Sequence, residues 1–317
     1  ATDPTSSFST QDAANAPDAG TAILSLWAFQ DGTDLKIVTG TATGPEFRYH
    51  VFHMATDLWD GTLKNETIED IKDSAANAQR ISIAVRSDGD VIALYIGDLD
   101  AIMGTNYARV DYAIRVTSWT AGVNVAGQGL ESDWASGAAG RGTSDKTHFI
   151  YGDATNADVY HRSLSSADSL GTQHLVDDTT VAQVFTPSVY YDAAGTERIT
   201  AVYQDADSTL QSVIIEADGT PDTPDNASDS TVLILNLTPV CCLALENGTT
   251  KKVHLLYADA ATRDLWYDSN TNDAGWGTDT EVLDAVTINR ISCNVYDRSG
   301  TKLAYVYDDG GTVKYNE

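Results

Sequence analysis

The chain contains little cysteine, and its cysteines form no recognisable framework. Its 317 residues include three, Cys241, Cys242 and Cys293. An odd number this small is not a disulfide scaffold, and without a Cys-x-x-Cys pair a thiolate zinc site is not expected. Cys242 and Cys293 hold equivalent places in the first strands of adjacent repeats, described below. Because such strands diverge, we expect free buried thiols there.

Positively charged residues are scarce as well. The chain has 19 Lys and Arg against 46 Asp and Glu, a formal net charge of -27. Without a basic run it cannot bind nucleic acid through phosphates, and an anionic membrane surface would repel it. No apolar stretch is long enough to insert into a membrane. Excess aspartate is typical of a saline or marine habitat, and a secreted acidic protein from any habitat is the alternative.

What the chain does contain is a repeat. An aliphatic strand ends in tyrosine, and an aspartate follows two or three residues later. The tyrosines lie 56, 52, 54 and 50 residues apart, at Tyr95, Tyr151, Tyr203, Tyr257 and Tyr307. A period of this size predicts one supersecondary unit used several times.

Each repeat predicts a small antiparallel sheet. A first strand, such as 80–86, reaches a tight turn at 87–90, and the tyrosine strand returns from it. A third strand rich in aromatics follows, and fourth strands are expected at 230–235 and 280–283. Irregularities are expected at Thr39-Gly40, as one or two helical turns within 67–77, and as a flexible insertion at 137–142.

These repeats predict an all-β fold, a six-bladed β-propeller of four-stranded antiparallel blades. We expect residues 1–317 to form one domain, with residues 1–19 as closing strand and linker. The blades begin near residues 20, 78, 127, 184, 237 and 288. The last has three strands, so the N-terminal segment would pair with it and close the ring, which removes exposed sheet edges. A seven-bladed propeller built from a longer chain is the alternative.

The copy at 253–283 carries a family resemblance. It reads Val253 to Asp259, then Leu265-Trp266-Tyr267, then Gly275-Trp276, then Glu281-Val282-Leu283. This order resembles the blades of lectin-like and sialidase-like (BNR-type) propellers. The chain departs from them in lacking intact Asp-boxes and an assignable arginine triad. The resemblance therefore implies architecture and leaves activity open.

The repeated aspartates are the candidate metal ligands. On one face of a propeller, their carboxylates would form a ring able to bind Ca²⁺ or sugar hydroxyls. The alternative is turn chemistry, because an aspartate side chain accepts hydrogen bonds from its own turn. The five positions are Asp98, Asp153, Asp205, Asp259 and Asp309.

Aromatic and basic side chains near strand ends are the candidate ligand-binding residues. Sugar rings stack on aromatic faces, and the His161-Arg162 pair that follows Tyr160 suits an anionic sugar. The alternatives are packing between blades for the aromatic rings and a solvated pair for His161-Arg162. The candidates are Trp59, Trp119, Trp134, Trp276, Tyr160 and Arg162. We expect Tyr267 to pack between blades and His148 and His254, at equivalent positions, to be structural.

No catalytic motif appears, so the sequence favours a binder over an enzyme. We expect a recognition propeller that binds glycan or a cell-surface receptor, extracellular or on a virion surface, alone or within an oligomer or larger assembly. The first alternative is a polysaccharide-active hydrolase or lyase of propeller fold, which predicts a pocket holding carboxylates or a His/Tyr pair of shifted pKa. The second is a structural virion component.

Overall fold

In the computed structural model the regular secondary structure of the described residues is β-strand. The described residues are 23–41, 46–56, 58–63, 65–70, 81–97, 109–125, 135–139, 146–153, 158–178, 183–184, 188–191, 196–205, 207–235, 238–247, 251–284, 286–297 and 301–316. Within these ranges every sheet is antiparallel and no helix occurs, so none could cross a membrane. The chain divides into an N-terminal unit, Ala1–Gly129, and a C-terminal unit, Leu130–Glu317.

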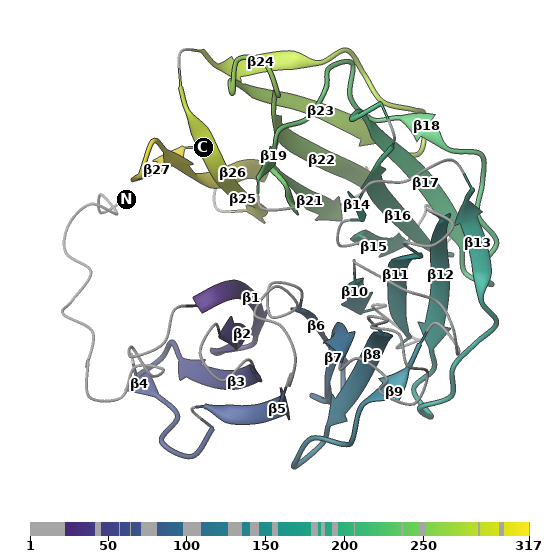
Figure 1. The fold of residues 1–317 in the computed structure, drawn as a ribbon, viewed down its shortest axis with the longest axis vertical. Coiled ribbons are helices and arrows are strands. Elements are labelled where there is room, and N and C mark those ends of the chain that lie inside the picture. The colour runs from purple at the N-terminus through teal and green to yellow at the C-terminus, as the bar shows by residue number, and fades with distance from the viewer. Residues whose placement is uncertain are drawn as a thin grey trace, which may run out of the picture. The chain divides into compact units, whose positions relative to one another are not determined.

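The N-terminal unit contains two sheets (Figure 1). In sheet 1 the strand order is β1-β2-β3, and β4 and β5 both pair with β3; in sheet 2 it is β6-β7-β8-β9. Sheet 1 consists of β1 (Ile23–Asp31), β2 (Asp34–Thr41), β3 (Glu46–His53), β4 (Leu58–Trp59) and β5 (Glu66–Asp70). Sheet 2 consists of β6 (Ile81–Val85), β7 (Val91–Gly97), β8 (Arg109–Arg115) and β9 (Val123–Asn124).

The first two sheets of the C-terminal unit follow the same plan. Sheet 3 runs β10-β11-β12-β13, and sheet 4 runs β14-β16-β17-β18 with β15 also on β16. Sheet 3 consists of β10 (Ala135–Ala139), β11 (Thr147–Asp153), β12 (Asp158–Leu164) and β13 (His174–Asp177). Sheet 4 consists of β14 (Gln183–Val184), β15 (Ser188–Tyr191), β16 (Glu197–Gln204), β17 (Leu210–Glu216) and β18 (Asp225–Asn226).

Two further sheets complete the C-terminal unit. Sheet 5 runs β21-β22-β23-β24, sheet 6 runs β25-β26-β27, and β19 (Ile234–Leu235) pairs with β20 (Thr238–Pro239) in a small ribbon. Sheet 5 consists of β21 (Cys241–Asn247), β22 (Lys251–Ala258), β23 (Leu265–Thr271) and β24 (Thr280–Leu283). Sheet 6 consists of β25 (Ile288–Asp297), β26 (Thr301–Asp309) and β27 (Thr312–Asn316).

Neighbouring sheets within each unit pack face to face. One core cluster joins sheet 1 to sheet 2, another sheet 3 to sheet 4, a third sheet 4 to sheet 5, and a fourth sheet 5 to sheet 6. Because successive side chains of a strand point to opposite faces, a sheet covered on both faces needs apolar residues at consecutive positions. This explains the uninterrupted aliphatic runs that end in the repeated tyrosines, of which Tyr95, Tyr151, Tyr203 and Tyr257 are fully buried.

The sequence predicted the repeated hairpins well and the connections less well. The tyrosine strands are β7, β11, β16, β22 and β26, and the expected strand at 280–283 is β24. The strand expected at 230–235 is present only as β19 (Ile234–Leu235), and its expected place is wrong, because β18 (Asp225–Asn226) is the fourth strand of sheet 4. The short helix expected within 67–77 is wrong for residues 67–70, which lie in β5, and residues 71–77 lie outside the described residues. Of the insertion expected at 137–142, residues 137–139 lie in β10 and the rest lies outside the described residues.

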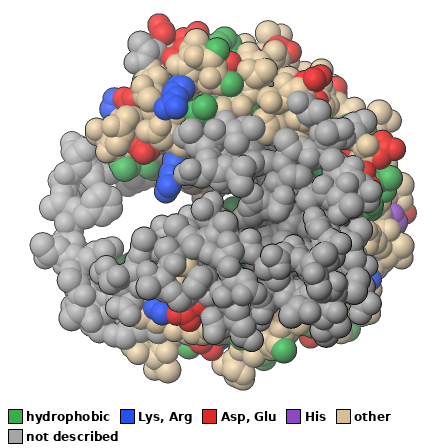
Figure 2. Space-filling view, viewed as in Figure 1, with side chains coloured by type: hydrophobic (Ala, Val, Ile, Leu, Met, Phe, Trp, Pro, Cys, Tyr) green, Lys and Arg blue, Asp and Glu red, His purple; other side chains and the backbone are tan. Residues whose placement is uncertain are grey.

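Acidic side chains outnumber basic ones on the described part of the face in Figure 2. Figure 2 shows carboxylate side chains scattered over the described surface on the face in view, with far fewer lysines and arginines. Hydration and salt weaken the repulsion between such exposed like charges.

Candidate functional site: a pocket between sheets 5 and 6

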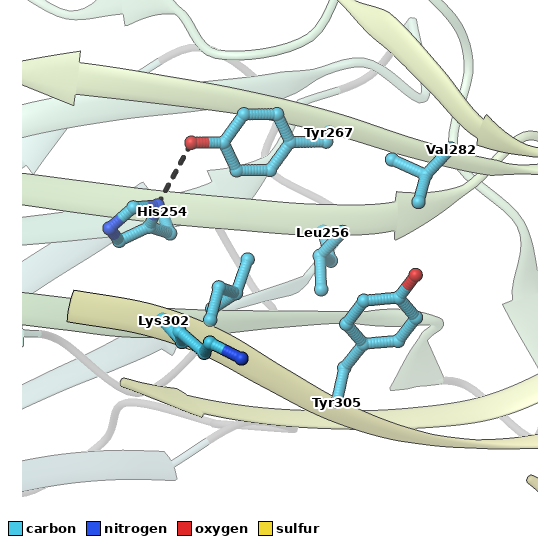
Figure 3. A pocket seen from close by; sticks show the side chains of 7 residues that line it. His254, Leu256, Tyr267, Val282, Lys302 and Tyr305 are labelled. Atoms are coloured by element: carbon cyan, nitrogen blue, oxygen red, sulfur yellow. Dashed lines mark hydrogen bonds between the residues drawn. The ribbon is translucent and has the colours of Figure 1, made fainter. Parts of the chain in front are cut away.

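A pocket of about 390 Å³ lies between the last two sheets of the C-terminal unit. Sheet 5 contributes one wall and β26 of sheet 6 the other (Figure 3). The lining residues are His254, Leu256, Tyr267, Val282, Lys302, Leu303 and Tyr305. The volume is in the range of pockets that hold small ligands.

Strand alternation places these side chains. In β22, Leu255 and Tyr257 belong to the core shared with sheet 4, so Leu256 lies on the opposite face and joins the core shared with sheet 6. His254 has the same parity as Leu256 and therefore faces the pocket. Tyr267 is the cross-strand partner of Leu256. The pocket continues the core between sheets 5 and 6, because Leu256 and Tyr305 belong to both.

A histidine and a tyrosine form a hydrogen-bonded pair in one wall. Nδ1 of His254 lies 2.9 Å from the hydroxyl oxygen of Tyr267, as the dashed line in Figure 3 marks. Oε2 of Glu246 lies 3.4 Å from Nε2 of the same imidazole. Burial and the nearby Lys252 ammonium lower the pKa of His254, while Glu246 opposes the shift. The imidazole is therefore neutral at pH 7 and can exchange a proton with the phenol.

The opposite wall supplies a second tyrosine and a lysine. The Nδ2 group of Asn316 donates a 2.8 Å hydrogen bond to the Tyr305 hydroxyl, so that hydroxyl can still donate its own proton. Burial raises the pKa of Tyr305, which keeps it a phenol. Lys302 is exposed, and Figure 3 shows its amine directed toward the ring of Tyr305. The pocket thus combines aromatic and aliphatic walls with a few convergent polar groups.

The tryptophans predicted as ligand contacts in the N-terminal unit pack against its interior. Trp59 lies in β4 with its ring centroid 5.1 Å from that of Phe52. Trp119 meets Tyr49 edge to face at 5.5 Å and packs on the core between sheets 1 and 2. Neither residue lines the pocket, and their assignment as ligand contacts stays a prediction.

The candidates in the C-terminal unit are also held by internal contacts. The Trp276 indole donates a 2.5 Å hydrogen bond to Oγ of Ser212, and the ring packs on the core of sheets 4 and 5. The Tyr160 hydroxyl donates to Asp158, and Nε of Arg162 donates to the Gly171 carbonyl. These positions too stay predictions, and Trp134 lies outside the described residues.

Two of the repeated aspartates, Asp205 and Asp259, accept hydrogen bonds within their own turns. The Asp205 carboxylate accepts from the backbone N–H groups of Asp207 and Thr209, and that of Asp259 accepts from Ala261 and Thr262. For Asp205 and Asp259 this is the turn chemistry that the sequence offered as the alternative to metal binding. Asp309 differs, because its carboxylate accepts from the distant Thr287 N–H and forms an ion pair with Lys314. Asp98 and the side chain of Asp153 lie outside the described residues, so the calcium ring stays a prediction.

The sequence assigned the pocket residues differently. It named His254 and Tyr267 as structural, and it singled out neither Lys302 nor Tyr305. One signal was present: two residues before the repeated tyrosine, the other copies carry Ala93, Phe149, Ala201 and Leu255, and the last copy alone carries a polar ring, Tyr305. The three cysteines are free and partly exposed, and burial of their sulfur atoms raises the pKa values of Cys241 and Cys242.

Comparison with known proteins identifies the kind of fold. No family model matches the chain, and no curated protein matches it. The BP39L lectin from Burkholderia pseudomallei is 11% identical with a TM-score of 0.64, over 93% of this chain and 84% of that one. The Aleuria aurantia lectin in complex with α-methyl-L-fucoside is 13% identical with a TM-score of 0.52, over 94% of each chain. A Hadza microbial sialidase is 12% identical with a TM-score of 0.55, over 93% of this chain and 65% of that one.

These similarities show the fold alone. The chain has an all-β fold like that of lectins and sialidases, built from antiparallel sheets. Because this fold carries binders and enzymes alike, function must be argued from the pocket.

Proposed function

We propose that the protein is a glycan-recognition module and that the pocket between sheets 5 and 6 binds a sugar unit. The observation that carries the proposal is the pairing of Tyr267 and Tyr305 with Lys302 around one concavity. Tyrosine rings cover the apolar face of a sugar, while hydroxyl, imidazole and ammonium groups bind its oxygens. The lectins of similar fold, one of them solved with a fucoside, support this proposal.

The same proposal extends to architecture and location. We propose that the six sheets are blades of one six-bladed propeller spanning residues 1–317, closed by the N-terminal segment at sheet 6. The three strands of sheet 6, against four or five in the other sheets, support it. An acidic module of this kind suits display outside the cell or on a virion, where it would engage a surface glycan.

The test is a binding screen followed by calorimetry. Labelled protein is applied to an array of neutral, fucosylated, sialylated, sulfated and uronic-acid glycans, and hits are titrated in solution. Saturable binding that the Tyr267→Ala variant loses supports the proposal. If no glycan in the panel is bound in solution, the proposal fails.

A second candidate function follows from one observation, the hydrogen-bonded pair of His254 and Tyr267. A neutral imidazole joined to a phenol can move a proton, as cleavage of an acidic polysaccharide by elimination or hydrolysis requires. Incubation with uronic-acid polysaccharides, followed by assays for unsaturated products and reducing ends, tests it. Turnover that His254→Gln abolishes would establish an enzyme, and glycan binding without turnover would exclude this candidate.

A further inference from the structure

Three histidines lie in a row across sheet 3, on the face that packs against sheet 4. Each comes from a different strand: His148 from β11, His161 from β12 and His174 from β13. Strand register explains the row, because Ile150, which belongs to the core shared with sheet 4, pairs with His161, and His161 pairs with His174. His148 lies two residues before Ile150 and therefore points to the same face. The ring centroids of His161 and His174 are 6.3 Å apart.

A buried carboxylate fixes the tautomers in this row. Nε2 of His148 lies 2.9 Å from Oε1 of Glu197, and Nδ1 of His148 lies 3.0 Å from Nε2 of His161. These three residues are at most 4% exposed. Because an ionised carboxylate can only accept, His148 donates from Nε2 and accepts at Nδ1 from the Nε2–H of His161. The other nitrogen of that second ring, Nδ1 of His161, therefore carries a lone pair and no proton.

This lone pair is buried, and within the described part of the chain it has no hydrogen-bond partner. It faces a space that Gly219 leaves open in the turn after β17. A Cβ added to Gly219 would lie 3.2 Å from Nδ1 of His161 and 2.9 Å from Nε2 of His174. Two ring nitrogens thus converge on one point, and leaving a buried acceptor without a partner there is costly.

The other repeats show that packing between sheets does not require histidines at these positions. His161 and His174 are directly opposed on neighbouring strands. The corresponding pairs in sheets 2, 4 and 5 are Tyr112 with Val123, Ser212 with Asp225, and Tyr267 with Thr280. Of these four sheets, sheet 3 alone places two imidazoles opposite each other, so the pair calls for an explanation beyond the fold.

We propose that His161 and His174 bind a divalent transition-metal ion through Nδ1 of His161 and Nε2 of His174. Imidazole nitrogens suit Cu²⁺, Ni²⁺ and Zn²⁺, whereas Ca²⁺ and Mg²⁺ prefer oxygen ligands. Directly opposed residues have Cβ atoms about 4.5–5.5 Å apart, so their imidazoles can share an ion about 2.0–2.1 Å from each nitrogen. The chain of hydrogen bonds through His148 to Glu197 orients the His161 ring, as the outer partners of metal-binding histidines do. The site is separate from the pocket and independent of glycan binding.

The charges around the two histidines are compatible with a bound cation. Burial, then the neighbouring imidazoles and Lys146, lowers the pKa of His161, which keeps its ring in the neutral form that a metal requires. The exposed carboxylate of Asp218 interacts electrostatically with His174. Together with Glu197, Asp218 offsets the positive charge of Lys146 and of the ion.

The test measures Cu²⁺, Ni²⁺ and Zn²⁺ binding to the chelator-treated full chain by calorimetry in about 150 mM NaCl, which screens diffuse attraction to the acidic side chains. We expect one saturable site that binds Cu²⁺ most tightly, with nitrogen hyperfine splitting in its electron paramagnetic resonance spectrum, and that excess Ca²⁺ does not displace the ion. His174→Thr installs the residue found in sheet 5. Because losing even an outer partner of a ligand histidine costs about 10- to 100-fold in affinity, this variant should weaken Cu²⁺ binding by about tenfold or more.

The matched control is His53→Gln, which removes another partly exposed imidazole, in sheet 1. It should leave Cu²⁺ affinity nearly unchanged, and circular dichroism should show both variants folded. Three results would overturn the proposal. The unaltered chain could show no saturable site, which would mean that the two nitrogens hold only water. Excess Ca²⁺ could displace the bound ion, which would assign it to carboxylates, or His174→Thr could bind Cu²⁺ as tightly as the control.

Discussion

The hydroxyl of Tyr203 in sheet 4 donates a 2.6 Å hydrogen bond to Oδ2 of Asp177 in sheet 3. Tyr203 is fully buried and Asp177 is 9% exposed. Burial, then the Asp177 carboxylate, raises the pKa of Tyr203 well above its ordinary value, so the phenol remains the donor. The tyrosine that marks this repeat in the sequence therefore links two sheets in the structure.

We predict that Tyr203→Phe destabilises the chain by about 1–3 kcal/mol, because it removes a buried hydrogen bond to a charged acceptor while keeping the ring. Urea unfolding followed by circular dichroism measures the change. Tyr315→Phe, at a side chain that is 46% exposed, is the control and should cost less. Equal unfolding midpoints for Tyr203→Phe and the unaltered chain would contradict this role for the hydroxyl.

Acid should weaken the N-terminal unit through His50. This imidazole is 1% exposed, its Nδ1 accepts from the Asn65 N–H, and its Nε2 contacts Oγ1 of Thr39. Burial, with a smaller effect of Arg48, lowers the pKa of His50 from 6.5 to about 4. Between these values the unfolded chain binds more protons, so stability should fall as pH drops from 6.5 to 4, by up to about 3 kcal/mol.

The His50→Gln variant tests this pH dependence. It should lose stability at pH 7 and show a smaller further loss between pH 6.5 and pH 4 than the unaltered chain. Unfolding curves at pH 7 and at pH 4 supply both numbers. The same decline in both chains would assign acid sensitivity to other groups, among them the buried His161, whose pKa burial also lowers.

Substituting two glycines of similar positive φ distinguishes the cost of backbone strain from the cost of steric crowding. Gly219 has φ +96°, and an added Cβ would lie 2.8 Å from Cδ2 of His174. Gly89 has φ +92° with nothing within 4 Å of an added Cβ. We predict that Gly89→Ala costs about 1–2 kcal/mol from strain alone, and that Gly219→Ala costs about 1–3 kcal/mol more from overpacking. Thermal unfolding of both variants checks the difference, and equal losses would show that His174 moves aside freely.

Lys302 should set a preference for acidic sugars. If the pocket binds a carboxylate or sulfate, Lys302→Gln should weaken binding about ten- to one-hundredfold, the value of a charge-assisted hydrogen bond. Neutral sugars should lose far less. Calorimetry with a matched pair, such as galacturonic and galactose oligomers, distinguishes the two. Equal losses of affinity for both ligands would mean that Lys302 acts through packing against the sugar and not through its charge.

The repeat made the sheets predictable because it reports packing directly. A run such as Val253 to Tyr257, apolar at nearly every position, occurs where both faces of a strand are covered, and the turn aspartates Asp205 and Asp259 follow from backbone chemistry. The outer strands were less predictable. β18 is two residues long and carries no apolar pattern, so nothing in its sequence distinguished it from the loop beside it.

The pocket was less accessible to sequence reasoning because it joins two repeats. Tyr305 and Tyr267 come from different sheets, and only their packing brings them to one concavity. Tryptophans near strand ends looked better exposed than they are, since Trp276 reaches back to Ser212, 64 positions away. A long-range contact of that kind produces no recognisable pattern in the sequence around either residue.

The most direct test of the central claim is a calorimetric titration of the strongest array ligand into three chains: the unaltered protein, Tyr267→Ala and Tyr160→Ala. Tyr267 lines the pocket, whereas Tyr160 stacks on Tyr151 in sheet 3. We expect Tyr267→Ala to weaken binding at least tenfold, about 1.4 kcal/mol, and Tyr160→Ala to leave it nearly unchanged, with both variants folded by circular dichroism. Full affinity in Tyr267→Ala, or loss of binding in Tyr160→Ala alone, would contradict the claim that this pocket is the glycan site.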